Sequence, residues 1–160
     1  MVFSTIVEIV NKTSPYKISL KEEGHYGGSF ETDRGLIYNI SLIKIIDIPI
    51  DETYYIAFES VESRKDRHDS KIGETITALI SSCIDIVENI IIFTCDNSDR
   101  KQEARNILFK RWFKKYIKKK YFRYDKSPND TFDRIYASFV CNINNPNIDK
   151  CMTLFDENFF

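Results

Sequence analysis

The run Ile90–Cys95, which reads IIIFTC, constrains the fold more than any other stretch of the chain. It contains no charged residue and is rich in β-branched side chains, which favour extended backbone. A run of this length is far too short to cross a bilayer, and it is typical of a strand that is buried on both faces. The sequence on either side should therefore supply helices that cover this strand.

Helical periodicity is present on both sides of that run. Apolar residues recur at three- and four-residue spacing over 72–87, which predicts an amphipathic helix with Asp69 or Ser70 as its N-cap. A second, longer helix is predicted over about residues 99–120. A last helix should open at Asn145–Pro146, because proline is favoured in the first helical position.

Alternating polar and apolar residues ahead of the first helix predict an antiparallel meander. Its strands are expected at 16–20, 35–42 and 53–60. A further strand is predicted at 135–141, and residues 121–124 are typical of a short edge strand. The predicted order is β-β-β-α-β-α-β-α, an α+β fold with a mixed sheet, an antiparallel N-terminal meander and helices packed on the sheet. With 160 residues, we expect one domain spanning 1–160.

The charge of the chain is strongly segregated. The formal net charge is −1, yet residues 100–126 hold twelve Lys or Arg against two acidic residues, a balance of +10. Residues 1–99 carry −8 and residues 127–160 carry −3. This distribution excludes a generally basic protein that coats nucleic acid, but it allows one focused contact with an anionic partner.

The basic charge coincides with the second predicted helix, whose apolar and basic side chains fall on opposite halves when placed at 100° per residue. The apolar half holds Leu108, Phe109, Trp112, Phe113, Tyr116 and Ile117. Arg105 also falls in the apolar half and needs a carboxylate partner there. The apolar half must face the core, so the basic half forms an exposed ridge.

Cations near a helix C-terminus favour the helix dipole, but two or three are enough for that effect. Like charges four residues apart, such as Lys110 and Lys114, slightly oppose helix formation. We therefore interpret the ridge as a binding surface for nucleic acid or a larger protein. The alternative is a solvated helix face. The candidate binding residues are Lys110, Arg111, Lys114, Lys115, Lys118, Lys119, Lys120 and Arg123.

The chain lacks the common catalytic and phosphate-binding motifs, so we predict no catalytic residue and no cofactor. Residues 24–28, which are rich in glycine, are interpreted as a turn between strands. His68 lies in a charged segment that is typical of an exposed loop. Asp96 and Asp99 stand where caps of the second helix are expected.

The cysteines favour a reduced, cytoplasmic protein. Cys83, Cys95, Cys141 and Cys151 form no C-x-x-C pair, and neither histidine lies near them in the sequence, so no metal site is predicted. The N-terminal residues lack the basic and apolar regions of a signal peptide. The thiols are expected to act as small apolar side chains.

Four segments carry a resemblance to a known family. They are Lys71–Ile76 at a helix start, Cys95–Asp99 together with Arg105, Leu108–Phe113, and Asn145–Pro146. In these segments the chain resembles a family of short, uncharacterised proteins of Bacteroidota, over about residues 16–158. The resemblance implies a fold and a bacterial source, and no activity. Some small proteins of these bacteria accompany CRISPR or other defence enzymes.

The order of meander, helix, strand, helix and strand also resembles the GCN5-related N-acetyltransferase family. Ala104, Leu108 and Trp112–Phe113 stand where that family carries an alanine, a tyrosine and a Gly-Phe pair. The family's acyl-CoA loop, Q/R-x-x-G-x-G/A, corresponds to Ser70–Thr75, which has a single glycine. The resemblance implies an acyltransferase fold whose loop and tyrosine are altered in this chain.

From these observations we expect a non-enzymatic accessory or adaptor protein, and a role in bacterial defence, such as that of a CRISPR effector accessory, is one form that this function could take. It would bind nucleic acid or a nucleic-acid-processing enzyme through the basic helix and would form a homodimer. The alternatives are a divergent GCN5-related acyltransferase and the small partner of a toxin–antitoxin pair.

Overall fold

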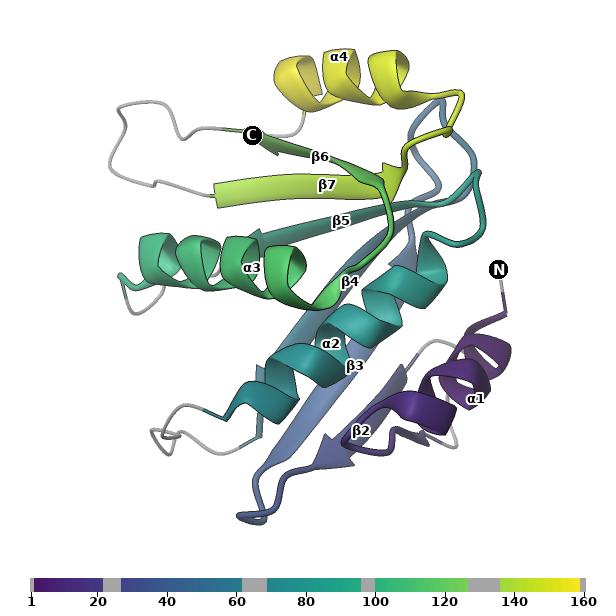
Figure 1. Cartoon of the computed structure of the whole chain (residues 1–160). Helices are drawn as coiled ribbons and strands as arrows, with labels where there is room; N and C mark the ends of the chain where they lie inside the picture. The colour runs from purple at the N-terminus through teal and green to yellow at the C-terminus, as the bar shows by residue number, and fades with distance from the viewer. Residues whose placement is uncertain (1, 22–26, 62–68, 96–99, 127–135, 159–160) are drawn as a thin grey trace.

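The computed structural model describes residues 2–21, 27–61, 69–95, 100–126 and 136–158 (Figure 1). Its helices are α1 (Phe3–Thr13), α2 (Ser70–Cys83), α3 (Gln102–Tyr116) and α4 (Ile148–Asn158). Its strands are β1 (Ser19–Leu20), β2 (Gly27–Glu31), β3 (Ile37–Lys44), β4 (Thr53–Ser60), β5 (Ile90–Cys95), β6 (Tyr121–Lys126) and β7 (Tyr136–Asn142).

The strands form one seven-stranded sheet in the order β1-β2-β3-β4-β5-β7-β6. Neighbouring strands are antiparallel except β4 and β5, which are parallel. The predicted α+β class with a mixed sheet is confirmed. The run Ile90–Cys95 is β5, and its first four residues are almost completely buried, as expected of a strand covered on both faces.

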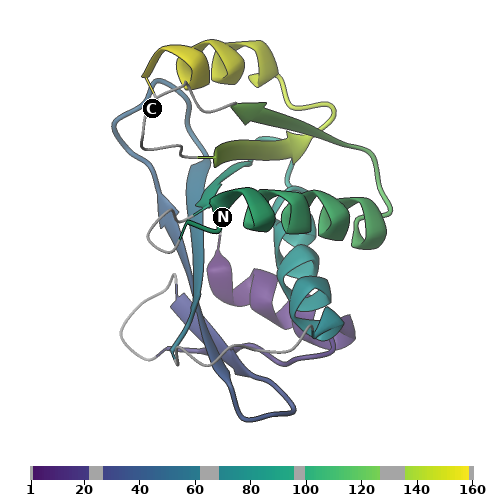
Figure 2. The same ribbon diagram turned by 90° about the vertical axis from the view of Figure 1, so that its left-hand side faces the viewer.

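Helices cover the two faces of the sheet unequally. The apolar faces of α1, α2 and α3 join one core cluster on one face, while α4 covers a second cluster on the other face of β5, β7 and β6. Figure 2 shows α3 and α4 on opposite sides of this end of the sheet. The predicted N-cap of α2 is confirmed, because the Asp69 carboxylate accepts a hydrogen bond of 2.9 Å from the Lys71 backbone N–H. No helix among the described residues has both the length and the apolar character that a membrane span requires.

The N-terminal region differs from the prediction in three ways. The strand expected at 16–20 is reduced to the two-residue β1. Helix α1 was not expected, although Phe3, Ile6, Val7 and Val10 follow helical spacing and are buried. Residues 27 and 28, expected in a turn, belong to strand β2. A Cβ on residue 28 would lie 2.9 Å from the Ile18 Cγ2 atom, so glycine is required here by close packing and not by a turn.

Three helices are shorter than predicted. Helix α2 ends at Cys83, although the helical spacing predicted it over 72–87. Helix α3 ends at Tyr116, because Ile117 already adopts an extended conformation and the chain enters β6 shortly afterwards. Lys118, Lys119 and Lys120 therefore lie in the connection between α3 and β6. Helix α4 begins at Ile148, beyond the expected start at Pro146. The predicted cap at residues 96–99 and both histidines lie outside the described residues.

Candidate functional site

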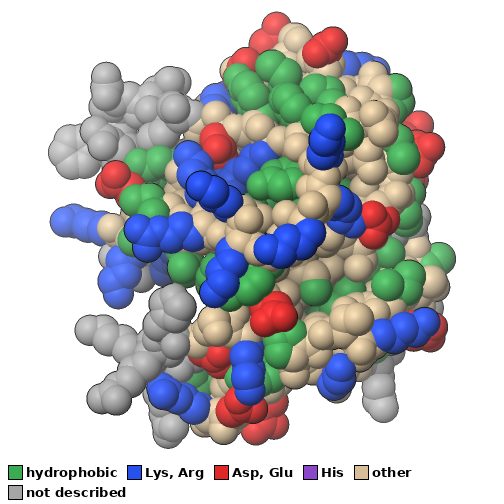
Figure 3. All heavy atoms as spheres, viewed as in Figure 1, with side chains coloured by type: hydrophobic (Ala, Val, Ile, Leu, Met, Phe, Trp, Pro, Cys, Tyr) green, Lys and Arg blue, Asp and Glu red, His purple; other side chains and the backbone are tan. Residues whose placement is uncertain are grey.

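The solvent-facing side of α3 and the connection that follows it carry a dense group of cations. The inward side of the same segment is anchored by Phe109, Phe113 and Ile117, which are all buried. Side chains of Lys and Arg gather over α3 on the face shown in Figure 3. We call the following five exposed residues the basic surface: Arg111, Lys114, Lys115, Lys118 and Lys120.

These five residues make no ion pair with any residue in the described part of the chain. Two further predicted binding residues do have partners. The Lys110 ammonium lies 3.3 Å from an Asp125 carboxylate oxygen. Lys119 pairs with Asp85 and donates a hydrogen bond of 2.8 Å to the Ser81 carbonyl oxygen, which ties the connection to α2. Lys110 and Lys119 therefore lie beside the basic surface, and the carboxylates of Asp125 and Asp85 partly offset their charges.

Arg123 does not lie on the basic surface, contrary to the expectation. Its side chain is only 9% exposed, and its guanidinium lies 4.9 Å from the Phe113 ring centroid and 5.3 Å from that of Phe93. It also donates to Asp125 at 2.8 Å and to Ser138 at 3.3 Å. These contacts join α3, β5, β6 and β7 beneath the helix, so Arg123 positions α3 and is not available to a partner.

The Asp125 carboxylate, which is 32% exposed, completes this arrangement. Burial raises its pKa, but the hydrogen bond from Ser138 and the charges of Arg123 and Lys110 outweigh burial and hold the pKa below its usual value. Asp125 is therefore ionised at neutral pH and compensates the buried guanidinium. The charges of Arg123 and Asp125 compensate each other, so this pair does not change the net charge of the basic surface.

The angle at which α3 presents its cations is set by a close contact with α2. The indole of Trp112 lies directly over Gly73, where a Cβ would approach the Trp112 Cε2 atom to 2.4 Å. The Tyr116 hydroxyl adds a hydrogen bond of 3.3 Å to the Ser70 carbonyl oxygen. A larger residue at position 73 would push the two helices apart and displace the basic surface.

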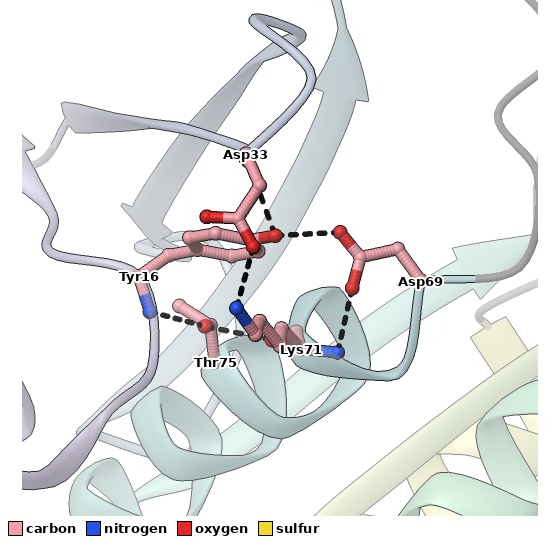
Figure 4. A network of polar contacts seen from close by, with 5 residues as sticks. All are labelled: Tyr16, Asp33, Asp69, Lys71 and Thr75. Atoms are coloured by element: carbon pink, nitrogen blue, oxygen red, sulfur yellow. Dashed lines mark hydrogen bonds and ion pairs between the residues drawn. The ribbon is translucent and has the colours of Figure 1, made fainter.

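A second polar cluster lies at the start of α2, and sequence analysis missed it (Figure 4). The buried Tyr16 hydroxyl donates to an Asp69 carboxylate oxygen at 2.7 Å, and Lys71 pairs with Asp33 at 2.5 Å. The Tyr16 backbone N–H donates to the Thr75 hydroxyl at 3.3 Å. These partners are distant in sequence, with Tyr16 and Asp69 53 residues apart, so no local sequence pattern predicts their contacts.

The protonation states in this cluster suit a structural role. Burial and the hydrogen bond to Asp69 raise the pKa of Tyr16 to about 12, so the phenol stays protonated at neutral pH. The hydrogen bond from Lys71 lowers the pKa of Asp33, and the same bond raises the pKa of Lys71. The cluster fastens the β2–β3 turn and the segment after α1 to the start of α2.

Strands β4 and β5 separate at their carboxyl ends. Their parallel pairing covers only Thr53–Tyr55 and Ile90–Ile92, after which β4 pairs with β3 alone and β5 with β7 alone. We call the divergent segments, 56–60 and 93–95, the β4–β5 fork. A hydrogen bond of 2.7 Å between the Tyr55 and Thr94 hydroxyls spans its base. On the helix side, the rings of Phe58, Phe93 and Phe109 fill the space beside it.

The cysteine thiols are placed where they cannot act as nucleophiles at neutral pH. All four cysteines are buried, and burial raises the pKa of each thiol to about 11 or 12, which keeps the thiols protonated and unreactive at neutral pH. Within the described ranges, no three His, Cys, Asp or Glu side chains lie close enough together to hold a metal ion.

Comparison with known proteins identifies the family of the chain. No curated protein and no solved structure matches it. The model of the family of unknown function DUF6169 matches residues 68–157, which include α2, α3 and the basic surface. Helix α1 and strands β1–β4 lie outside the matched segment. Because the match spans more than half of the sequence, the chain belongs to the family of unknown function DUF6169.

Proposed function

We propose that this protein is a non-enzymatic accessory protein that binds the phosphate backbone of nucleic acid through its basic surface. The observation that carries the proposal is the presence of five exposed cations that have no ionic partner among the described residues. Phosphate groups bind such surfaces by releasing condensed counterions, which requires exposed cations and no particular sequence.

Two features of the fold support this role. The helix that carries the cations is held rigidly, by Arg123 and two phenylalanine rings beneath it and by the Gly73–Trp112 contact beside it. A helix that is held in place presents Arg111, Lys114 and Lys115 without a cost of ordering the backbone when a partner binds. The aromatic rings Phe109 and Phe113 point into the core, so the surface provides charge and not a platform for stacking bases.

The triple substitution Lys114→Glu/Lys115→Glu/Lys118→Glu is expected to weaken nucleic-acid binding at least tenfold, because three attractive contacts become repulsive. Fluorescence anisotropy of a labelled 20-nucleotide single strand, titrated at several salt concentrations, measures the loss. The plot of log affinity against log salt should also become less steep, by roughly 0.7 for each phosphate contact removed.

A matched control variant distinguishes the effect of the basic surface from the effect of the overall net charge of the protein. Lys21→Glu/Arg34→Glu/Lys150→Glu changes the net charge equally at exposed positions near β1, in the β2–β3 turn and on α4, and it should affect binding much less. Equal losses in the two folded variants would overturn the proposal. A polyglutamate peptide that binds wild type as tightly as the oligonucleotide would assign the surface to an acidic protein instead.

The second candidate function is acyl transfer, and the β4–β5 fork is the observation that favours it. Diverging parallel strands leave backbone N–H and C=O groups without a strand partner, and such groups can bind an extended ligand that contains amides. The segment 70–75 does not fit the acyl-CoA loop, however, because its one glycine lies inside α2 against the indole of Trp112. That glycine cannot cradle a pyrophosphate.

Acetyl-CoA at millimolar concentration is therefore expected to leave the melting temperature unchanged. A ligand present at one hundred times its Kd would stabilise the protein by about 2.7 kcal/mol, which a thermal shift detects as several degrees. Coenzyme A without the acyl group serves as the control ligand. A clear upward shift with acetyl-CoA would replace the binding proposal with the acyltransferase.

A further inference from the structure

A shallow depression lies beside the basic surface, between the end of α1, the middle of α2 and the end of α3. Its volume is about 350 Å³, and Lys118 belongs both to its lining and to the basic surface. On α2 the lining includes Glu74, Ser81 and Ser82. A chain that follows the cations of α3 would therefore reach this depression next.

The lining is rich in hydroxyl groups, and its polar surface is larger than its apolar surface. Thr13, Ser81 and Ser82 contribute hydroxyls that make no hydrogen bond with the described residues. Ala78 and the ring of Tyr116 are the main apolar contributions. Peptide grooves hold their ligands with apolar pockets for anchor side chains, whereas sugars and phosphates are bound by hydroxyl and ammonium donors.

The lining of the depression also includes a carboxylate, that of Glu74. Glu74 and Lys118 both line it, yet neither side chain makes an ion pair or hydrogen bond with the described residues. Glu74 is the fifth residue of α2 and lies beyond the first turn, so the helix dipole does not account for it. A carboxylate is repelled by phosphate, but it is a strong acceptor for a ribose hydroxyl.

We propose that the depression recognises one ribonucleotide of an RNA strand, with a phosphate on Lys118 and the ribose 2′-hydroxyl donating to Glu74. This inference rests on the proposed nucleic-acid binding and narrows it to RNA. The 2′-hydroxyl is the group by which a protein distinguishes RNA from DNA. A hydrogen-bond acceptor placed at the sugar therefore strengthens the binding of RNA relative to DNA.

The test compares three labelled 12-nucleotide strands that contain only adenine and cytosine, so that RNA, DNA and 2′-O-methyl RNA carry the same bases. Wild type is expected to bind RNA about 5- to 20-fold more tightly than DNA, as a hydrogen bond to a charged acceptor implies. The 2′-O-methyl strand cannot donate from its sugar and should bind like DNA.

Single substitutions test which residue causes the preference for RNA over DNA. Glu74→Ala should reduce the preference for RNA to less than about twofold and leave DNA binding equal or tighter. Lys118→Ala should weaken RNA and DNA binding by the same factor, because it contacts phosphate. Glu103→Ala removes another exposed carboxylate, in the first turn of α3, and should keep the preference for RNA.

The outcomes separate this inference from the proposal on which it rests. Equal binding of RNA and DNA by wild type, or tight binding of the 2′-O-methyl strand, would overturn the ribose contact and leave backbone binding intact. An unchanged preference in folded Glu74→Ala would do the same. Absence of binding to every strand would overturn both.

Discussion

Arg123→Ala is expected to lower the free energy of unfolding by about 2 kcal/mol, because it removes a largely buried guanidinium that contacts two aromatic rings and a partly exposed carboxylate. Lys120→Ala, which removes an exposed cation nearby, should change stability by less than about 0.5 kcal/mol. Both substitutions remove one positive charge from the same basic segment. The difference between them therefore reports burial and contacts, not charge.

The physical reason lies beneath α3. The Arg123 guanidinium is covered by the rings of Phe93 and Phe113 and hydrogen-bonded to Asp125 and Ser138. Alanine would leave a cavity beside those rings and would remove the cation that compensates Asp125. Lys110, whose ammonium lies 3.3 Å from Asp125, retains part of that compensation, which keeps the expected loss from being larger.

Urea unfolding followed by the fluorescence of Trp112, the single tryptophan of the chain, measures both variants. Arg123→Lys keeps the charge but loses the planar guanidinium that lies over the rings, so an intermediate loss is expected. If Arg123→Ala is as stable as wild type but loses affinity for nucleic acid, Arg123 belongs to the binding surface after all.

Gly73→Ala should destabilise the protein by about 1–2 kcal/mol, although alanine is the better helix former by up to about 1 kcal/mol. The new methyl group would meet the rigid indole of Trp112 at 2.4 Å, far inside van der Waals contact. Relief requires α3 to move away from α2, which loosens the packing that the two helices share. The clash therefore outweighs the gain in helix propensity.

A double-mutant cycle isolates this contact. In a Trp112→Ala background the obstruction is absent, so Gly73→Ala should become stabilising by about 0.5–1 kcal/mol. Urea unfolding monitored by far-UV circular dichroism avoids dependence on the missing tryptophan fluorescence. A stabilising effect of Gly73→Ala with Trp112 present would contradict the close contact between α2 and α3.

Elements with strong local signals were predicted correctly. The apolar run Ile90–Cys95 forms the buried strand β5, and the cap at Asp69 opens α2, because both depend on residues adjacent in the chain. The absence of α1 from the prediction is an error of another kind. Its buried residues Phe3, Ile6, Val7 and Val10 follow helical spacing, so a local signal for α1 is present in the sequence.

The candidate site was predicted in part. The helix wheel correctly separated Arg111, Lys114 and Lys115 from the buried Phe109 and Phe113, since those residues follow one helical period. It could not show that the helix ends at Tyr116, because the turn into β6 is set by pairing with β7. The depression beside the basic surface could not be predicted either, since its lining comes from α1, α2, α3 and the residues that follow α1 and α3.

Local sequence was enough to establish the fold class and the presence of a basic, amphipathic helix, because periodicity and charge are properties of neighbouring residues. Only the folded chain determined which cations are free. Arg123 and Lys119 share the basic segment with Lys114 and Lys118, yet long-range partners on β5, β7 and α2 occupy them. Availability to a ligand depends on what surrounds a side chain in space, and those neighbours are brought together by tertiary packing.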